Sequence, residues 1–260
     1  MTLALRKAEV RAGPNVLLAP VTATLRPGRL TCIVGPNGAG KSTLVSLLSG
    51  ARRPDAGEVL LDGAPLQGVP LEALARRRAV MLQESAVAFD FSAAEVCGLG
   101  RYPHRLQPSR HEDRIVAEAL AAASVAALAS RSFATLSGGE KARVQLARAL
   151  AQVWEPDPAG ASRWLLLDEP TAALDLRHQH EVLQRVRALA EEEGVGVVAV
   201  LHDVNLALRY GDDALLLAAG RDARFGTVGD VLVPERIRDV WQVGCEWVRD
   251  AGGRAHLLFG

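Results

Sequence analysis

The segment GPNGAGKS at residues 35–42 has the residue types and spacing of a phosphate-binding loop. Glycines let the backbone curl so that successive N–H groups point at phosphate oxygens, and a helix beginning near Gly40 adds its positive end. Lys41 can reach the β- and γ-phosphates, and the Ser42 hydroxyl can bind Mg²⁺. We therefore predict that a nucleoside triphosphate and Mg²⁺ bind to Gly35, Pro36, Asn37, Gly38, Ala39, Gly40, Lys41, Ser42 and Thr43.

Two adjacent carboxylates, Asp168 and Glu169, follow the apolar run Trp164 to Leu167. Such a run predicts a buried strand, which we expect beside the strand that leads into the phosphate loop. Asp168 would then hold Mg²⁺, usually through water. Glu169 would orient or deprotonate the attacking water. A solvated Asp-Glu pair at a strand end is the alternative, and the phosphate loop favours the catalytic interpretation.

The elements that must position these residues alternate between strand and helix, which predicts an α/β fold with a parallel sheet. Residues 3–34 indicate short strands, the last of them a buried strand at 30–34, and residues 41–50 a helix. Further along the chain we expect strands at 58–61, 79–82, 164–168, 195–201 and 213–217, helices at 177–192 and 203–210, and a short helix with two strands within 234–260.

Residues 92–153 differ in composition from the rest of the chain. They are rich in Ala and Leu and have helical periodicity, apart from a loop at 101–111. We predict one domain over residues 1–260, with a helical lobe inserted at 84–153.

The segment LSGGE at residues 136–140 resembles the signature sequence of ABC-type ATPases. In that family two copies pair head to tail, and each signature covers the ATP held by the other copy. Three further residues stand in the family's order: Gln83 before this segment resembles the Q-loop glutamine, and Asp175 and His202 after it resemble the D-loop aspartate and the switch histidine.

This resemblance covers essentially the whole chain and implies a P-loop ATPase fold. The fold would have a RecA-like mixed or parallel sheet, an N-terminal antiparallel β subdomain and the helical lobe. ATP and Mg²⁺ are the implied cofactors. The resemblance implies catalysis by Glu169, His202 and Gln83, metal binding by Ser42, Gln83 and Asp168, and contact with the partner copy's ATP through Ser137, Gly139 and Asp175.

Two positions depart from the family pattern. The family usually stacks an aromatic ring on adenine from the first strands, but the matching position here is Val10, and no aromatic residue precedes Phe89. We therefore expect weaker adenine contact and poor discrimination among nucleotides. Ala172 stands where the family often has Ser, and we expect a small effect.

The spacing of the motifs and the length of the chain exclude several kinds of ABC ATPase. About 95 residues separate Lys41 from Ser137, which leaves no room for a long coiled coil, and the chain has one nucleotide unit and no fused membrane span. We therefore expect a separate ATPase subunit, with a transmembrane permease dimer docking near residues 83–101. Phe89 and Phe91 in that segment contact either the permease or the core of the chain itself.

The insert at residues 154–164, marked by Trp and Pro, resembles the ATP-binding subunits of haemin importers. That likeness implies an indirect partner, a periplasmic haemin-binding protein. Close relatives serve ferric siderophores and cobalamin, and a soluble ABC ATPase of iron–sulfur cluster assembly is a further alternative. The loop residues His104 and His111 are expected to be solvated rather than to bind haem.

Composition excludes several classes of protein. The chain has 30 Lys and Arg against 30 Asp and Glu, so a general polyanion binder, and with it a nucleic-acid partner, is not expected. The apolar run at 115–129 is too short to span a bilayer, and residues 1–11 lack the pattern of a signal peptide. Three isolated cysteines suit a reducing compartment. We expect a peripheral location at the cytoplasmic face of the inner membrane.

Overall fold

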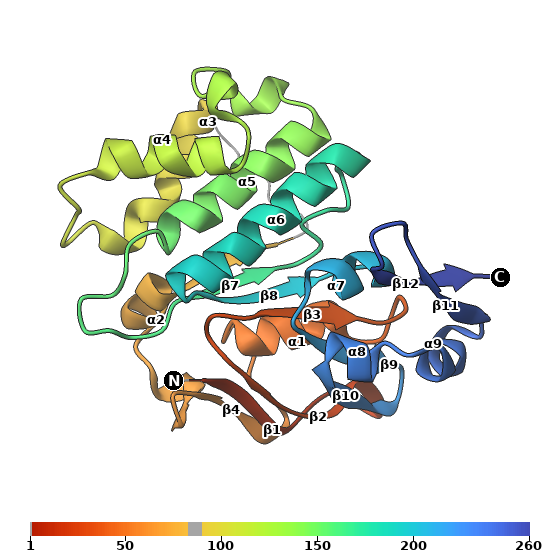
Figure 1. Cartoon of the computed structure of the whole chain (residues 1–260). Helices are drawn as coiled ribbons and strands as arrows, with labels where there is room; N and C mark the ends of the chain where they lie inside the picture. The colour runs from red at the N-terminus through yellow and green to blue at the C-terminus, as the bar shows by residue number, and fades with distance from the viewer. Residues whose placement is uncertain (1, 83–89) are drawn as a thin grey trace.

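The computed structural model describes residues 2–82 and 90–260, in which two sheets lie at the centre and helices cover them (Figure 1). Within those residues six strands form the larger sheet, in which all neighbours are parallel except the antiparallel edge pair β10 and β9. In order across the sheet they are β10 (Arg221–Thr227), β9 (Asp213–Ala218), β3 (Leu30–Val34), β8 (Gly196–Val200), β7 (Trp164–Leu167) and β6 (Arg78–Met81).

Both faces of the inner strands β3, β7 and β8 are buried, as their continuous apolar sequences predict. Successive side chains of β7 enter different hydrophobic clusters, because side chains alternate across a strand. Leu165 and Leu167 pack with the helices on one face, whereas Trp164 and Leu166 pack on the other face with α1 and the N-terminal strands.

The N-terminal strands form an antiparallel sheet, so the predicted β subdomain is confirmed. In order across the sheet they are β2 (Asn15–Leu25), β1 (Leu3–Ala12), β4 (Ala56–Leu61) and β5 (Ala64–Pro65). The helix α1 (Lys41–Leu48) packs against this sheet through Leu44, Leu47 and Leu48, which are fully buried. The phosphate loop therefore starts from a strand of one sheet and ends on a helix that is held by the other.

The opposite face carries a layer of helices, seen above the sheet in Figure 1. They are α3 (Ala93–Gly98), α4 (Glu112–Ala122), α5 (Gly138–Gln152) and α6 (Leu176–Glu193), with α2 (Leu71–Arg77) and α7 (Val204–Tyr210) at the sheet ends. Short 3₁₀ helices lie at Leu66–Gly68, Leu99–His104, Ala126–Leu128 and Phe133–Thr135. The chain closes with α8 (Val228–Val231), α9 (Pro234–Trp241) and the hairpin β11 (Cys245–Arg249) and β12 (Ala255–Phe259), which confirms the expected short helix and two strands.

One hydrophobic cluster runs from the sheet into these helices, joining Leu165 of β7 to Ile115 of α4. The helices of the 84–153 segment therefore share a core with the sheet, and the lobe boundary stays a prediction.

The prediction that β7, the strand before Asp168, lies directly beside the phosphate-loop strand β3 is wrong. Strand β8 lies between β3 and β7, with Ile33 opposite Val200 and Ala199 opposite Leu167. Strand order is not encoded in the apolar pattern of parallel strands, since all of them are buried on both faces. At about 4.8 Å per strand spacing, the carboxyl ends of β3 and β7 are roughly 10 Å apart, which leaves room for phosphates between them.

Candidate functional site

The phosphate loop follows β3, and its glycines are required by its surroundings. Gly40 precedes α1 with φ +93°, a left-handed conformation that favours glycine. A Cβ atom at Gly40 would lie 2.5 Å from the carbonyl oxygen of Leu17 in β2. A Cβ atom at Gly35 would lie 2.5 Å from the carbonyl oxygen of Leu217. The loop is thus clamped between two sheets.

Lys41 lies inside this loop and is only 7% exposed. Its Nζ donates to the carbonyl oxygens of Gly35 at 2.9 Å and Pro36 at 3.1 Å. Burial lowers the pKa of Lys41, and the nearby carboxylates of Glu169 and Asp168 oppose that effect. The ammonium group is therefore held in place by the loop, near Glu169, the predicted catalytic carboxylate, and Asp168, the predicted metal ligand.

Asp168 ends the acidic strand and is buried. Burial raises the pKa of its carboxyl group, and a hydrogen bond from the Ser42 side chain opposes the rise. Its Oδ1 is buried without a hydrogen-bond partner among the residues that the structure describes. A buried carboxylate oxygen without a donor, beside a hydroxyl, fits a hard divalent cation, which prefers oxygen ligands. The residues present therefore fit Mg²⁺ at the predicted position.

Glu169 and His202 meet although 33 positions separate them. Glu169 Oε1 lies 2.6 Å from His202 Nε2. Glu169 follows β7 and His202 lies just beyond β8, so neighbouring parallel strands deliver both side chains to one sheet edge. Glu169 also has φ +55°, a conformation that is strained for a residue with a side chain. The structure thus joins the predicted base and the predicted switch histidine.

A cleft of about 720 Å³ opens over these groups. Its described lining is Val16, Leu17, Asn37, Gly38, Gly40, Lys41, Ser42, Thr43, Glu169 and His202. The assignment of Val10 as the residue facing adenine is wrong, because Val10 is fully buried between the two sheets and does not line the cleft. Sequence reasoning missed Val16 and Leu17; their signal was an apolar pair placed directly after the turn at Pro14 and Asn15.

The signature segment lies away from this cleft. Ser137 caps α5 through a reciprocal pair with Glu140, and Gly139 packs so closely that its Cβ would lie 2.9 Å from the carbonyl oxygen of Ala173. Asp175 caps α6, accepting from the His178 amide at 2.9 Å. The signature and the Asp175 loop therefore adjoin each other. Neither contributes to the described lining of the cleft beside Lys41.

Two of the predicted docking and catalytic residues, Gln83 and Phe89, lie outside the described residues. Phe91 is partly buried against the helical core, which favours the core interpretation for that ring.

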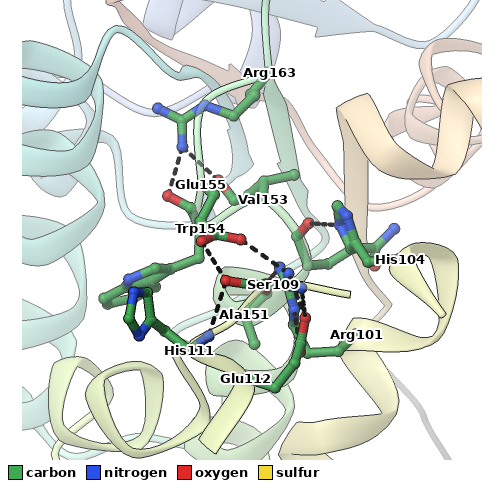
Figure 2. A network of polar contacts seen from close by, with 11 residues as sticks. Arg101, His104, Ser109, His111, Glu112, Ala151, Val153, Trp154, Glu155 and Arg163 are labelled. Atoms are coloured by element: carbon green, nitrogen blue, oxygen red, sulfur yellow. Dashed lines mark hydrogen bonds and ion pairs between the residues drawn. The ribbon is translucent and has the colours of Figure 1, made fainter. Parts of the chain in front are cut away.

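The loop at 101–111 is largely exposed, but Arg101 is buried and His104 is half-buried, and both join it to other elements. Arg101 is buried and donates to Glu112 at 2.8 Å, to Glu155 at 3.1 Å and to the carbonyl oxygen of Ala151 at 2.8 Å (Figure 2). His104 Nε2 lies 2.9 Å from the carbonyl oxygen of Gln152, and burial lowers the pKa of its imidazole. The expectation that His104 is solvated is therefore wrong.

The same network anchors the insert that follows α5. Arg163, near the end of the insert, donates to the carbonyl oxygens of Val153 at 2.6 Å and Trp154 at 2.7 Å, where the insert begins (Figure 2). Glu155 accepts from Arg101 and, at 2.7 Å, from Ser109. The insert is thus tied both to the 101–112 segment and to the start of β7.

Residues 18–172, more than half of the chain, match the model of the family described as ABC transporter. The chain belongs to the ABC transporter family. Membership makes it an ATP-binding, ATP-hydrolysing subunit, and it confirms the predicted fold.

Named relatives within the ABC family are similar over nearly their whole length. The hemin import ATP-binding protein HmuV of Pseudomonas entomophila is 48% identical over 235 residues, 90% of each chain. HmuV of Myxococcus xanthus is 48% identical over 260 residues, covering 99% of this chain and 96% of the relative.

Solved structures agree with the ABC fold. An ABC transporter in an inward-facing conformation matches with a TM-score of 0.81 at 24% identity, covering 100% of this chain and 97% of that chain. A dimeric bacterial ABC transporter cassette matches with a TM-score of 0.74 at 27% identity, covering 87% and 98%. Over the described residues of the present chain, no helix combines the length and apolarity needed to cross a bilayer.

Proposed function

We propose that this chain is the ATPase subunit of a haemin importer. The observation that carries the proposal is the 48% identity, across 99% of the chain, to a protein named for hemin import. The anchored insert at 154–163 supports it, because that segment is where the sequence resembles haemin importers.

The chemistry assigned to the cleft is hydrolysis of ATP. The water oxygen bonds to the γ-phosphorus while the bond from that phosphorus to the bridging oxygen breaks, and ADP leaves with the bridging oxygen. Glu169 orients the water and accepts its proton. Lys41 and the loop N–H groups hold the phosphates, and His202 and Gln83 contact the γ-phosphate and the water. Mg²⁺, held by Ser42, Asp168 and Gln83, would neutralise phosphate charge.

The working unit is proposed to be a head-to-tail dimer. Ser137 and Gly139 lie away from their own chain's cleft, next to the Asp175 loop. In a dimer these residues would close the partner's cleft instead. ATP would then favour the closed dimer through its higher affinity for that state, and closure would pull on the permease.

The permease is proposed to dock on the 83–101 segment of the 84–153 lobe, within the single domain 1–260. Large apolar side chains within or near that segment in the sequence are exposed, as expected for a protein interaction site. They are Leu71, Leu82, Leu99, Tyr102 and Leu106. Docking would hold the subunit at the cytoplasmic face of the inner membrane, with a periplasmic haemin-binding protein as an indirect partner.

Growth on defined iron sources tests the proposal. Cells lacking this chain would be grown on haemin, on a ferric siderophore, on an iron salt, and separately with cobalamin as the required nutrient. They would be complemented with the wild type or with Glu169→Gln. The expected result is a defect on haemin alone that only the wild type repairs.

Other growth patterns would overturn the haemin assignment. A growth defect with the siderophore alone, or with cobalamin alone, would mean that this cargo and not haemin is imported, by the same ATPase mechanism. A defect on every iron source would favour iron–sulfur cluster assembly. Full rescue by Glu169→Gln would remove hydrolysis from the transport step.

A further inference from the structure

A second cavity, of about 620 Å³, lies where the C-terminal hairpin β11–β12 packs beside α7 (Figure 1). Residues of α6, α7, α8 and the hairpin line it, and none of its described lining residues belongs to the Lys41 cleft. Its volume falls in the range of about 300–1,000 Å³ that is usual for sites that bind small molecules. The proposed hydrolysis of ATP makes no use of this cavity.

The cavity combines an apolar wall with a guanidinium group. The apolar lining is Leu206, Leu208, Val228, Trp247 and Ala255. Trp247 is 42% exposed, so part of its ring is open to a ligand. In the described part of the chain Arg209 has no carboxylate partner, whereas Arg254 pairs with Asp250 at 3.0 Å. A flat, largely apolar molecule that carries a carboxylate matches these walls, since aromatic rings stack and a guanidinium pairs with a carboxylate.

Two imidazole groups also line the cavity, from elements far apart in the sequence. His256 lies on β12 and His180 on α6. His180 Nδ1 lies 2.6 Å from the hydroxyl oxygen of Tyr210, which fixes the orientation of the ring. Its Nε2 has no hydrogen bond to any of the residues that the structure describes. A partner on one ring nitrogen is what orients most histidines that bind a metal through the other nitrogen.

We propose that this cavity binds haemin and that bound haemin slows ATP hydrolysis. The inference rests on the proposed function, which supplies the identity of the flat anion. Haemin is a planar, largely apolar ring system with carboxylate arms and an iron ion that imidazole can bind. His180 would bind the iron, Trp247 would contact the ring system and Arg209 would pair with a carboxylate.

The cavity is joined to the switch histidine through the first turn of α7. The Asn205 side chain ties the hairpin to that turn, because it donates to the Leu257 carbonyl oxygen at 2.9 Å and accepts from the Leu257 amide at 2.8 Å. Asp203 lines the cavity, caps the same turn and directly follows His202. His202 contacts Glu169 in this arrangement, and a ligand favours the arrangement that it binds. Haemin in the cavity should therefore keep His202 on Glu169 and away from the γ-phosphate.

Absorption spectroscopy of the isolated full chain tests the site. Haemin would be titrated into the wild-type chain, and iron-free protoporphyrin IX would serve as the second probe. We expect one saturable haemin site per chain with a shifted Soret band. Protoporphyrin IX should bind about tenfold more weakly or worse, because it lacks the metal that His180 would bind.

Three variants locate the binding. His180→Ala should remove the shift of the Soret band and raise the Kd for haemin by about tenfold. Trp247→Ala should raise that Kd by about fivefold through loss of ring contact. His111→Ala, at an exposed histidine of the 101–111 loop, is the matched control and should change neither quantity. Thermal unfolding of each variant checks that it folds.

Phosphate release at saturating ATP measures the coupling. Saturating haemin should slow the wild type and His111→Ala by about fivefold. Trp247→Ala should hydrolyse ATP at the wild-type rate without haemin, and it should need about five times more haemin for the same effect.

The outcomes separate this inference from the proposed function. Absence of a saturable haemin site, or equal haemin affinity in the wild type, His180→Ala and Trp247→Ala, would overturn the assignment of the cavity. Haemin that binds there without slowing phosphate release would overturn the coupling. Both results would leave the importer function standing, which the growth experiment tests separately, whereas a wild-type chain without ATPase activity in the absence of haemin would contradict the proposed function itself.

Discussion

At the scale of single residues, the side chains of the candidate site are held by contacts with one another, and the contact between Glu169 and His202 is the shortest one described above. Their 2.6 Å contact joins the ends of two strands, and the left-handed backbone of Glu169 turns its side chain toward the cleft instead of along the sheet. Lys41 is likewise tied to its own loop carbonyls. In the proposed mechanism, Glu169 and Lys41 exchange these partners for water and phosphate when a nucleotide enters.

Glu169→Gln should separate binding from hydrolysis. The amide keeps the size of the side chain but cannot accept the proton of the attacking water, so turnover should fall by about 10²–10⁴ while the Kd for ATP stays nearly the same. Phosphate release and calorimetry measure the two quantities. Glu246→Gln, at an exposed position on β11, is the matched control and should leave both unchanged. Retained turnover in Glu169→Gln would exclude Glu169 as the base.

At the scale of elements, the Arg101 network joins segments that the chain separates by some 50 positions. The guanidinium bonds to the first turn of α4, to the end of α5 and to the insert after it (Figure 2). Because the Arg101 side chain is only 7% exposed, the carboxylates of Glu112 and Glu155 balance its charge in place of water. The network therefore fixes the helices around 101–112 to the segment that leads into β7.

Arg101→Met should lower the free energy of unfolding at pH 7 by about 2 kcal/mol. This value lies between the cost of breaking a fully buried ion pair and that of breaking an exposed one, because Arg101 is buried and its carboxylate partners are partly exposed. The Arg101 hydrogen bond holds the pKa of Glu112 below its usual value. A carboxyl with a lowered folded pKa stabilises the protein above its unfolded pKa, and this stabilisation is lost as pH falls through the folded value. The gap between wild type and variant should therefore narrow below about pH 4.

Denaturant unfolding at pH 7 and pH 3.5 would measure that gap. Arg114→Met removes an exposed partner of Glu118 on α4 and should lower the free energy of unfolding far less than Arg101→Met does, with no dependence on pH. A gap for Arg101→Met that is constant with pH would contradict the role of Glu112.

Local chemistry was predictable from the sequence, whereas long-range neighbours were not. The phosphate loop, Asp168 and Glu169 were predicted from residue types and spacing, and His202 from its place in the order of motifs that resemble the ABC family. The structure brings Lys41, Glu169 and His202 to one cleft. The position of β8 between β3 and β7 was missed because buried parallel strands look alike. Val16 and Leu17 were missed because only the folded chain shows that Leu17 presses on Gly40. The Arg101 network was missed because loop arginines and histidines are usually solvated.

At the scale of the whole molecule, the chain presents two separate surfaces. The Lys41 cleft lies between the sheets, and the capped start of α5 with Ser137 adjoins the Asp175 loop elsewhere. The apolar side chains around Leu99 and Tyr102 add a third exposed region on the 84–153 segment. This layout suits a subunit that contacts nucleotide, a second copy and a membrane partner at once.

The separation of Ser137 from its own cleft has a genetic consequence. Lys41→Ala and Ser137→Arg should each inactivate a homodimer, but a mixed dimer would unite the sound cleft of one chain with the sound signature of the other. Equal mixing should restore about a quarter of wild-type phosphate release, since half the dimers are mixed and each regains one site. Lys41→Ala mixed with the double variant should restore none, and no recovery in the first mixture would place the complete site within one chain. Two alleles that fail alone would then complement each other inside one cell.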